Sequence, residues 1–327
     1  MHAGFIISTV KAVVIAVALL GIVPALVWLE RRLMGRFQVR LGPNRVGPFG
    51  FGQPIADSIK LLFKESIIQS SADKFLFHLA PAIVVFTAIV TFSVIPFGAP
   101  LTVFGEKIGL WGANINSGLL FVFAISGMGV YGMVLAGLSS NNKYSLMGGL
   151  RSSAQMISYE LTLGLSALSV IVLTGSLNLI DLVDSQKTIP FILVQPVAFL
   201  LFFIAGVAET NRAPFDLPEA EQELVAGFHT EYTGMKFAMF FMGEYVNMIT
   251  MSSMVTLLFL GGWNSYGLPV WPILAFAGKV FFLLCVFIWL RSTFPRIRYD
   301  RLMTFGWKFL LPLCLFNLLV TAVIKVL

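Results

Sequence analysis

Eight apolar runs dominate the sequence, and each is long enough to cross a membrane as a helix of about 20 residues. They lie at residues 8–29, 76–97, 118–138, 155–174, 192–210, 237–260, 271–291 and 308–326. Only 12% of the 327 residues are charged, against about a quarter in soluble domains. The runs are continuous rather than alternating, which excludes a transmembrane β-barrel. The sequence therefore predicts an all-α integral membrane protein with eight transmembrane helices in a single polytopic domain, residues 1–327.

Positive charge marks one side of this predicted membrane domain. Loops 30–74, 139–154, 209–236 and 291–306 carry sixteen of the 22 lysines and arginines, and the opposite loops carry only Lys107 and Lys187. Because basic residues concentrate in cytoplasmic loops, we expect these four loops to be cytoplasmic, or matrix-side in an organelle, and both termini to lie outside. The net charge of +6 follows from this topology and needs no nucleic-acid partner. The first run lacks a small-residue cleavage site, so we expect a retained helix rather than a signal peptide.

The long loop after the first run contains a short segment of split polarity. It begins at Pro54, and its apolar and charged side chains fall on opposite helical faces: Ile55, Ile59, Leu62 and Phe63 on one, Asp57, Lys60 and Lys64 on the other. This pattern predicts an amphipathic helix lying along the membrane surface. A helix packed on a soluble partner is the alternative.

Potential metal and cofactor ligands are few and scattered. Cys285 and Cys314 lie inside apolar runs without a Cys-x-x-Cys pair, and His2, His78 and His229 are far apart in the sequence. We expect no metal site and no redox centre in this chain. The run Gly127-x-Gly129-x-x-Gly132 matches a dinucleotide fingerprint in letters only, because it lies inside an apolar run. There, small residues favour close packing of helices.

Ionisable residues inside the apolar runs are the first candidates for function. A charge within the membrane costs about 2.5 to 3.5 kcal/mol on insertion scales, so such residues usually face a polar interior. Glu160, Glu209, Glu244 and Lys279 are of this kind, and burial would let the acids take up and release protons. Two structural explanations stay open: Glu160 and Glu209 reach water at the membrane boundary, or Glu244 and Lys279 form an ion pair.

Acidic residues also crowd the loop that follows Glu209. Asp216, Glu219, Glu221 and Glu223 lie on a segment that Pro214 and Pro218 prevent from forming a regular helix at its start. Carboxylates this close would titrate as a coupled group, so a nearby change of charge would affect all of them. A solvated acidic loop is the alternative, although Phe215, Leu217 and Leu224 between the acids favour packing.

Five polar stretches together resemble one family, the H subunit of respiratory complex I, which is the quinone-site membrane component of proton-translocating NADH:quinone oxidoreductase. They are Glu30-Arg31-Arg32 with Arg40-Leu41-Gly42-Pro43-Asn44-Arg45-Val46-Gly47, the Asp57–Glu65 stretch, Ser140–Leu146, Glu209–Glu223 and Phe294–Asp300. The resemblance runs in order from the first apolar run to the last. One departure is the loop Pro218-Glu219-Ala220-Glu221-Gln222-Glu223, where many relatives have Gly-Glu-Ser-Glu after the first acid; the number of acids is kept.

The resemblance implies a chamber for a lipid-soluble quinone, ubiquinone or menaquinone, beneath peripheral iron–sulfur subunits. Iron–sulfur clusters and FMN would belong only to partner subunits, which include small membrane subunits and antiporter-like subunits. A bacterial inner membrane is the expected location, with the mitochondrial inner membrane as the alternative. The resemblance assigns proton relay or coupling to a set of acids: Glu160, Glu209, Asp216, Glu219, Glu221, Glu223 and Glu231. Glu244 joins these relay candidates because of its position inside an apolar run. The resemblance assigns the quinone chamber and its entrance to a second set: Glu30, Arg31, Arg40, Arg45, Asp57, Lys60, Phe215 and Arg296. A role in binding lipid headgroups is the alternative for the arginines.

Two other functions fit parts of the sequence. A standalone ion-coupled secondary transporter would use intramembrane carboxylates too, but such folds often contain paired broken helices, which the sequence does not indicate. The homologous membrane subunit of an energy-converting hydrogenase would lack a quinone. Long cytoplasmic loops suit a docking surface for partner subunits better than a lone transporter.

Overall fold

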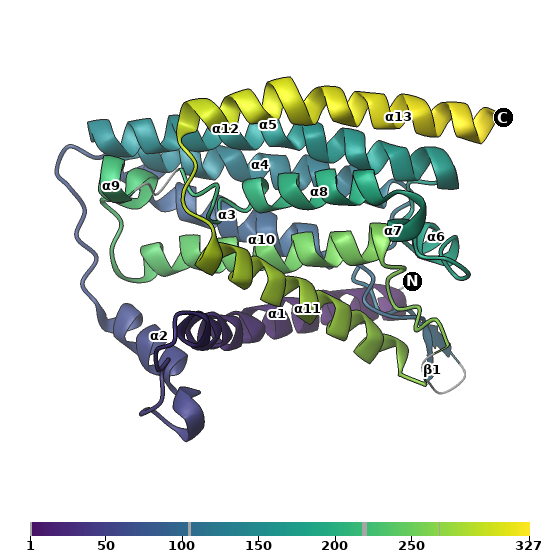
Figure 1. Ribbon diagram of the computed structural model, residues 1–327. Coiled ribbons are helices and arrows are strands. Elements are labelled where there is room, and N and C mark those ends of the chain that lie inside the picture. Colours follow the sequence, from purple (N-terminus) through teal and green to yellow (C-terminus); the bar gives the residue numbers. More distant parts are fainter. Residues whose placement is uncertain (1, 104–105, 218–220, 268) are drawn as a thin grey trace.

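The computed structural model describes residues 2–103, 106–217, 221–267 and 269–327, and its long helices run side by side in one bundle (Figure 1). Among these residues, six helical segments are long and apolar enough to cross a membrane. Five are α1 (His2–Phe37), α3 (Lys74–Ser93), α4 (Gly118–Ser139), α5 (Lys143–Thr174) and α11 (Pro272–Thr293). The sixth is continuous from Tyr299 to Val326 and comprises α12 (Tyr299–Phe305), the π-helical turn η3 (Gly306–Leu310) and α13 (Leu311–Val326).

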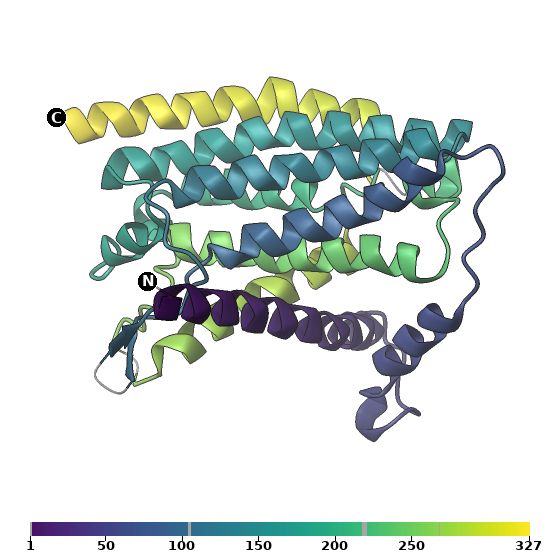
Figure 2. The same cartoon turned by 180° about the vertical axis from the view of Figure 1, so that it is seen from behind.

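The other two predicted spans correspond to helices that differ from this pattern. The run 192–210 is divided at Gln195, between α7 (Phe191–Val194) and α8 (Pro196–Glu209), because Pro196 starts a new helix. The 14 residues of α8 therefore extend only about 21 Å. The run 237–260 forms α10 (Gly234–Phe259), which is 26 residues long but carries Lys236 and Glu244. Both helices lie alongside the others in two opposite views (Figures 1 and 2).

The two ends of the bundle carry different elements. One end carries η1 (Pro48–Gly50), α2 (Gln53–Phe63), α9 (Glu221–Leu224) and η2 (Gly227–His229). The other end carries α6 (Leu179–Asp184) and an antiparallel hairpin of β1 (Leu101–Val103) and β2 (Glu106–Ile108). The start of α1 and the end of α13 lie at this second end as well (Figure 1). The four loops predicted to share one side thus share one end (Figure 1). The described residues form an all-helical bundle, as expected, and the short hairpin between α3 and α4 is an addition that the sequence did not predict.

Local sequence signals explain where the helices begin and end. The Asp73 carboxylate accepts hydrogen bonds from the backbone of Phe75 and Leu76 at the start of α3, and Asn142 caps α5 through Tyr144 in the same way. Gly175 ends α5 in a left-handed conformation, with φ of 76°. Short polar side chains and one glycine therefore set these boundaries.

The glycines of α4 allow its close approach to neighbouring helices. A Cβ atom at Gly132 would lie 2.4 Å from Val84 Cγ2 and 3.1 Å from the Ala80 carbonyl oxygen on α3. A Cβ at Gly127 would lie 2.7 Å from a carboxylate oxygen of Glu160 on α5. The prediction that these glycines serve helix packing is confirmed.

The predicted amphipathic helix is confirmed as α2, with Pro54 in its first turn. Its apolar side chains have few contacts within this chain, and Ile55, Ile59, Leu62 and Phe63 are 56%, 50%, 60% and 87% exposed. Figure 1 shows α2 projecting from the bundle beyond the end of α1. An exposed apolar face of this kind is available to lipid or to a partner.

His229 lies in an aromatic cluster where η2 packs against α10. Its ring stacks on Phe237 with centroids 5.3 Å apart, and the side chain is 8% exposed. Burial lowers the pKa of His229 to about 4. The imidazole ring is therefore neutral at pH 7, because burial disfavours its protonated form.

Replacing Gly132 by valine should destabilise the protein by about 1 to 3 kcal/mol, because the new side chain would overlap Val84 and the Ala80 carbonyl. Gly164→Val is the matched control, since a Cβ at Gly164 meets nothing within 4 Å. Thermal unfolding of the purified protein measures both variants. Equal losses in the two variants would contradict close packing at Gly132.

Lowering the pH from 7 to 5 should destabilise the wild type more than a His229→Phe variant. The unfolded chain takes up a proton near pH 6.5 and the folded chain only near pH 4, so His229 reduces stability as the pH falls between these values. At pH 5 the difference should reach about 2 kcal/mol. Thermal unfolding of both proteins at both pH values measures it, and Phe at this position retains the stacked ring. Identical pH dependence would show that His229 does not titrate between the two states.

Candidate functional site

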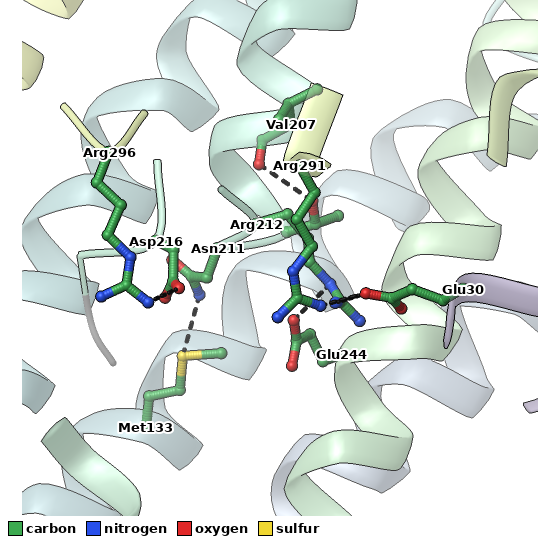
Figure 3. Close-up of polar contacts among 10 residues, drawn as sticks. Glu30, Met133, Val207, Asn211, Arg212, Asp216, Glu244, Arg291 and Arg296 are labelled. Atoms are coloured by element: carbon green, nitrogen blue, oxygen red, sulfur yellow. Dashed lines mark hydrogen bonds and ion pairs between the residues drawn. The ribbon is translucent and has the colours of Figure 1, made fainter. Parts of the chain in front are cut away.

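A cluster of four charged side chains joins α1, α10 and α11 to the segment that follows α8 (Figure 3). Arg212, in the segment after α8, donates to Glu30 Oε1 at 3.0 Å and pairs with Glu244 Oε1 at 2.6 Å. Arg291 donates to the same Oε1 atom of Glu30. The side chains of Glu30 and Arg212 are 2% and 4% exposed. Two acids and two bases thus form a cluster with no net charge.

The buried position of Arg212 depends on these carboxylates. Burial opposes the charged form, but the negative charges of Glu244 and Glu30 raise the pKa of Arg212 well above its usual value. The guanidinium carbon also lies 4.5 Å from the ring centroid of Tyr245. A buried charge of this kind is tolerated only when it is paired, so each carboxylate contributes to holding Arg212 in place.

The segment after Arg212 is packed rather than solvated. Gln155 on α5 donates from Nε2 to the carbonyls of Ala208 and Phe215, both at 2.8 Å. Phe215 is 7% exposed, and its ring centroid lies 6.1 Å from that of Tyr159. Asp216, 5% exposed, accepts a hydrogen bond from Arg296 Nη2 at 2.9 Å. At Asp216 the alternative of a solvated loop is therefore wrong.

Glu209 differs from the acids of the cluster because no base of the described ranges pairs with it. It ends α8 and is 5% exposed, and its Oε2 atom has no hydrogen-bond partner among the described residues. Glu160 on α5 is close enough to repel it electrostatically. The alternative that Glu209 reaches bulk water is wrong, whereas Glu160 is half-buried. The two acids form a pair without a counter-charge on the described part of the chain.

A small cavity of about 20 Å³ lies beside the charged cluster. Asn211, His229 and Glu244 line it, together with apolar side chains. Asn211 Oδ1 and His229 Nδ1 have no hydrogen-bond partner among the described residues. A cavity of this size with two or more polar groups can hold a water molecule, which would join the loop to Glu244.

The remaining predicted relay acids are spread along the loop. Glu231 accepts a hydrogen bond from Asn142 at 2.7 Å, and Glu223, 53% exposed, pairs with Arg151 at 2.5 Å. Glu221 begins α9, and Glu219 lies outside the described residues. The structure therefore brings Glu209 close to Glu160, and it brings Asp216 close to Arg296. Glu223, in contrast, is exposed to solvent.

The predicted entrance residues divide into a paired group and an exposed group. Asp57 of α2 pairs with Arg31 at 2.5 Å and with Lys60 at 3.8 Å. Burial alone would raise the pKa of Asp57, but hydrogen bonds from Arg31 and Gln53 lower it below its usual value. Arg31 thereby ties the end of α1 to α2. A second, open cavity of about 380 Å³ is lined by Arg32, Arg36, Arg40, Leu41, Gly42, Pro43, Asn44 and Phe49, and Arg45 is exposed close by in the sequence.

Sequence reasoning missed Arg212 and Arg291, which complete the cluster. The only available signal was the position of Arg212 inside the acidic segment between two apolar runs.

The alternative that Glu244 pairs with Lys279 is also wrong, because Lys279 donates to backbone carbonyls of Leu260, Gly262 and Asn264 at 2.7, 3.0 and 2.7 Å. Lys279 thus closes the turn that follows α10. Among the described residues, no group of three or more His, Cys, Asp or Glu side chains could hold a metal ion.

Comparisons with known proteins agree on one family. Residues 10–322 match the protein family described as NADH dehydrogenase. A relative from Syntrophobacter fumaroxidans, named as an H subunit of NADH-quinone oxidoreductase, is 51% identical over 98% of this chain and 96% of its own. An H subunit of the same enzyme from Geobacter metallireducens is 53% identical over 96% and 95% of the two chains, and that of Protochlamydia amoebophila is 53% identical over 90% of each. This chain therefore belongs to the NADH dehydrogenase family.

Proposed function

We propose that this chain is the membrane subunit of a proton-translocating NADH:quinone oxidoreductase and that it forms a quinone chamber with peripheral iron–sulfur subunits. The relatives of about 50% identity, each named as an H subunit of NADH-quinone oxidoreductase, support the assignment. Quinone, ubiquinone or menaquinone, would be the substrate. Iron–sulfur clusters and FMN would reside in partner subunits. Small membrane subunits and antiporter-like subunits would complete the enzyme.

The proposed topology places the chain in a bacterial inner membrane as one polytopic domain with eight spans and both termini outside. The parallel arrangement of α8 and α10 with the six apolar segments supports eight spans. The basic loops at one end support a cytoplasmic position for that end. The exposed apolar face of α2 would then lie against the membrane at the chamber entrance.

The burial of Glu209 without a paired base among the described residues is the observation that carries the proposed coupling. A carboxylate in such a place is neutral unless its surroundings change, which suits a group that gains and loses protons. Reduction of quinone would change the charge at the loop that holds Asp216, and the buried segment from Asn211 to Phe215 connects that loop to the end of α8. Glu209 and Glu160 would pass the resulting proton toward the antiporter-like subunits. Glu219, Glu221, Glu223 and Glu231 would extend the group toward the chamber.

The charged cluster would shape the floor of the chamber rather than carry protons by itself. Glu30 and Glu244 are both paired with Arg212, so their negative charges are already compensated. Glu244 also lines the small cavity beside Asn211, which would give it contact with a water molecule. Arg31, Arg40, Arg45, Asp57, Lys60, Phe215 and Arg296 would line the entrance and the chamber wall.

Replacing Glu209 by glutamine should reduce both quinone reduction and proton pumping of the assembled enzyme by at least about tenfold, because positioned proton-transfer groups typically contribute about a hundredfold or more. Asp184→Asn is the control, since this acid pairs with Lys187 at the opposite end of the bundle and is 47% exposed. NADH:quinone activity and acidification of vesicles measure the two functions. Wild-type rates in both assays would remove Glu209 from the relay.

Replacing Arg212 by methionine should destabilise the protein by about 3 to 5 kcal/mol, since it leaves Glu30 and Glu244 without their shared buried partner. Adding Glu244→Gln to this variant should restore part of the loss. Arg298→Met is the control, because Arg298 is 76% exposed in its pair with Asp300 and should change stability by less than about 1 kcal/mol. Thermal unfolding of the three variants tests the assignment, which fails if Arg212→Met and Arg298→Met are equally stable.

A further inference from the structure

An apolar groove of about 440 Å³ opens on the side of the bundle between α1 and α11, away from the charged cluster. Its floor is made by Leu19, Ser253 and Leu284, which are 1%, 1% and 6% exposed. The Ser253 hydroxyl donates to the Ile249 carbonyl at 2.8 Å, so the floor presents no unpaired hydroxyl to the groove. At its edges Val14 and Phe281 are 59% and 53% exposed. The groove is thus apolar throughout and open to the lipid side of the bundle.

The length of the groove matches one leaflet of a membrane. On α11 its lining extends from Ile273 to Leu284, eleven residues farther along the helix, which is about 16 Å. Half of the hydrocarbon core of a bilayer is about 15 Å. The volume also falls within the range of small-ligand sites, about 300 to 1,000 Å³. One extended acyl chain is an occupant of the right length and polarity.

A positive charge lies at the outer end of the groove. Lys11 precedes the groove residue Ile15 by one helical turn of α1, so both lie on the same face. The Lys11 ammonium donates to the Gly109 carbonyl at 3.1 Å. This bond uses one of three donors and brings no negative charge. The ammonium can therefore also donate to a phosphate.

An aromatic residue locates the same end at the membrane boundary. Trp271 lies two residues before Ile273, at the start of α11, and is 78% exposed. Exposed tryptophans gather at the level of lipid headgroups. The groove therefore begins at headgroup depth, with a lysine on one wall and a tryptophan on the other, and extends toward the middle of the membrane.

We propose that this groove binds one acyl chain of an anionic glycerophospholipid, whose phosphate contacts Lys11. The lipid would belong to the leaflet at the end of the bundle where both chain termini lie. The site is distinct from the proposed quinone chamber, because no residue of the charged cluster lines the groove, and the long loops lie at the opposite end of the bundle from the chain termini (Figure 1). The lipid would fill the gap between α1 and α11 and would join these helices in the outer half of the bundle.

The test uses the protein purified from its native membrane with any subunits that accompany it. It is reconstituted into phosphatidylcholine vesicles containing phosphatidylglycerol with a photoreactive diazirine on one acyl chain. After illumination, mass spectrometry of peptides should find label on residues 11–22 and 273–284 at higher yield than on the exposed face of α13. Excess unlabelled phosphatidylglycerol should remove this label. Competition by a long-chain quinone instead would overturn the proposal and assign the groove to a quinone tail.

Variants of two adjacent residues on α11 separate the groove from the surrounding lipid surface. Ala277 lines the groove and is exposed, so Ala277→Trp should fill it and lower the labelling severalfold. Gly278 does not line it, and a Cβ there meets nothing within 4 Å, so Gly278→Trp should label as the wild type does. Equal labelling of the two variants would overturn the acyl-chain site. Thermal unfolding checks that both variants are folded.

Variants of Lys11 test the headgroup contact. Lys11→Met should lower labelling by phosphatidylglycerol about fivefold, the effect of one lysine near an anionic lipid surface. Lys11→Arg retains the charge and should keep most of the labelling. Wild-type labelling of Lys11→Met would overturn the contact between Lys11 and the phosphate.

Discussion

The buried pairing of Arg212 with two carboxylates is the interaction on which this end of the bundle depends. A guanidinium that is 4% exposed would be strongly unfavourable alone, and so would Glu30 at 2% exposure. Together they link the end of α1, the segment after α8 and the interior of α10. Arg291 also binds Glu30 and so joins α11 to the cluster. The cluster fixes the relative positions of four elements: α1, the segment after α8, α10 and α11.

Glu209 lies close to this cluster in the sequence but is not paired with a base among the described residues. Gln155 holds the segment from Ala208 to Phe215 through the backbone carbonyls at its two ends, and Asp216, the next residue, binds Arg296. This segment contains both Arg212 and Glu209, and the charged neighbour of Glu209 in the described structure is another acid, Glu160. The paired acids stabilise the structure, whereas Glu209 lies beside a second acid and has no paired base among the described residues. The same short stretch of chain thus contains both kinds.

Sequence patterns predicted those parts of the fold that depend on local composition. Continuous apolar runs and basic loops identified the long helices and the end at which the loops gather. Pro54 and the division of apolar and charged side chains between two helical faces identified α2. The break at Gln195 was signalled by Pro196 but was not recognised, because an apolar run of sufficient length outweighed one proline. The hairpin was missed since its strands are only three residues long.

The candidate acids could be predicted for a similar reason, because a carboxylate inside an apolar run is visible in the sequence. Their partners could not. Arg212 and Glu30 are 182 residues apart, and no periodicity connects residues at such a distance. The same limit applies to Lys279, whose partners are backbone carbonyls without any residue signature. Which acids are paired with a base, and which are not, became visible only in three dimensions.

The order in which the chain is made adds a consequence of the contact between Glu30 and Arg291. These residues are 261 positions apart, so at about 5 to 20 residues per second the ribosome needs roughly 13 to 52 s to supply the second after the first. During that interval α1 has already left the ribosome with an acid that later belongs inside the protein. Glu30 therefore stays without either of its bases until Arg212 has been made, 182 residues later, and without its second base until Arg291 follows.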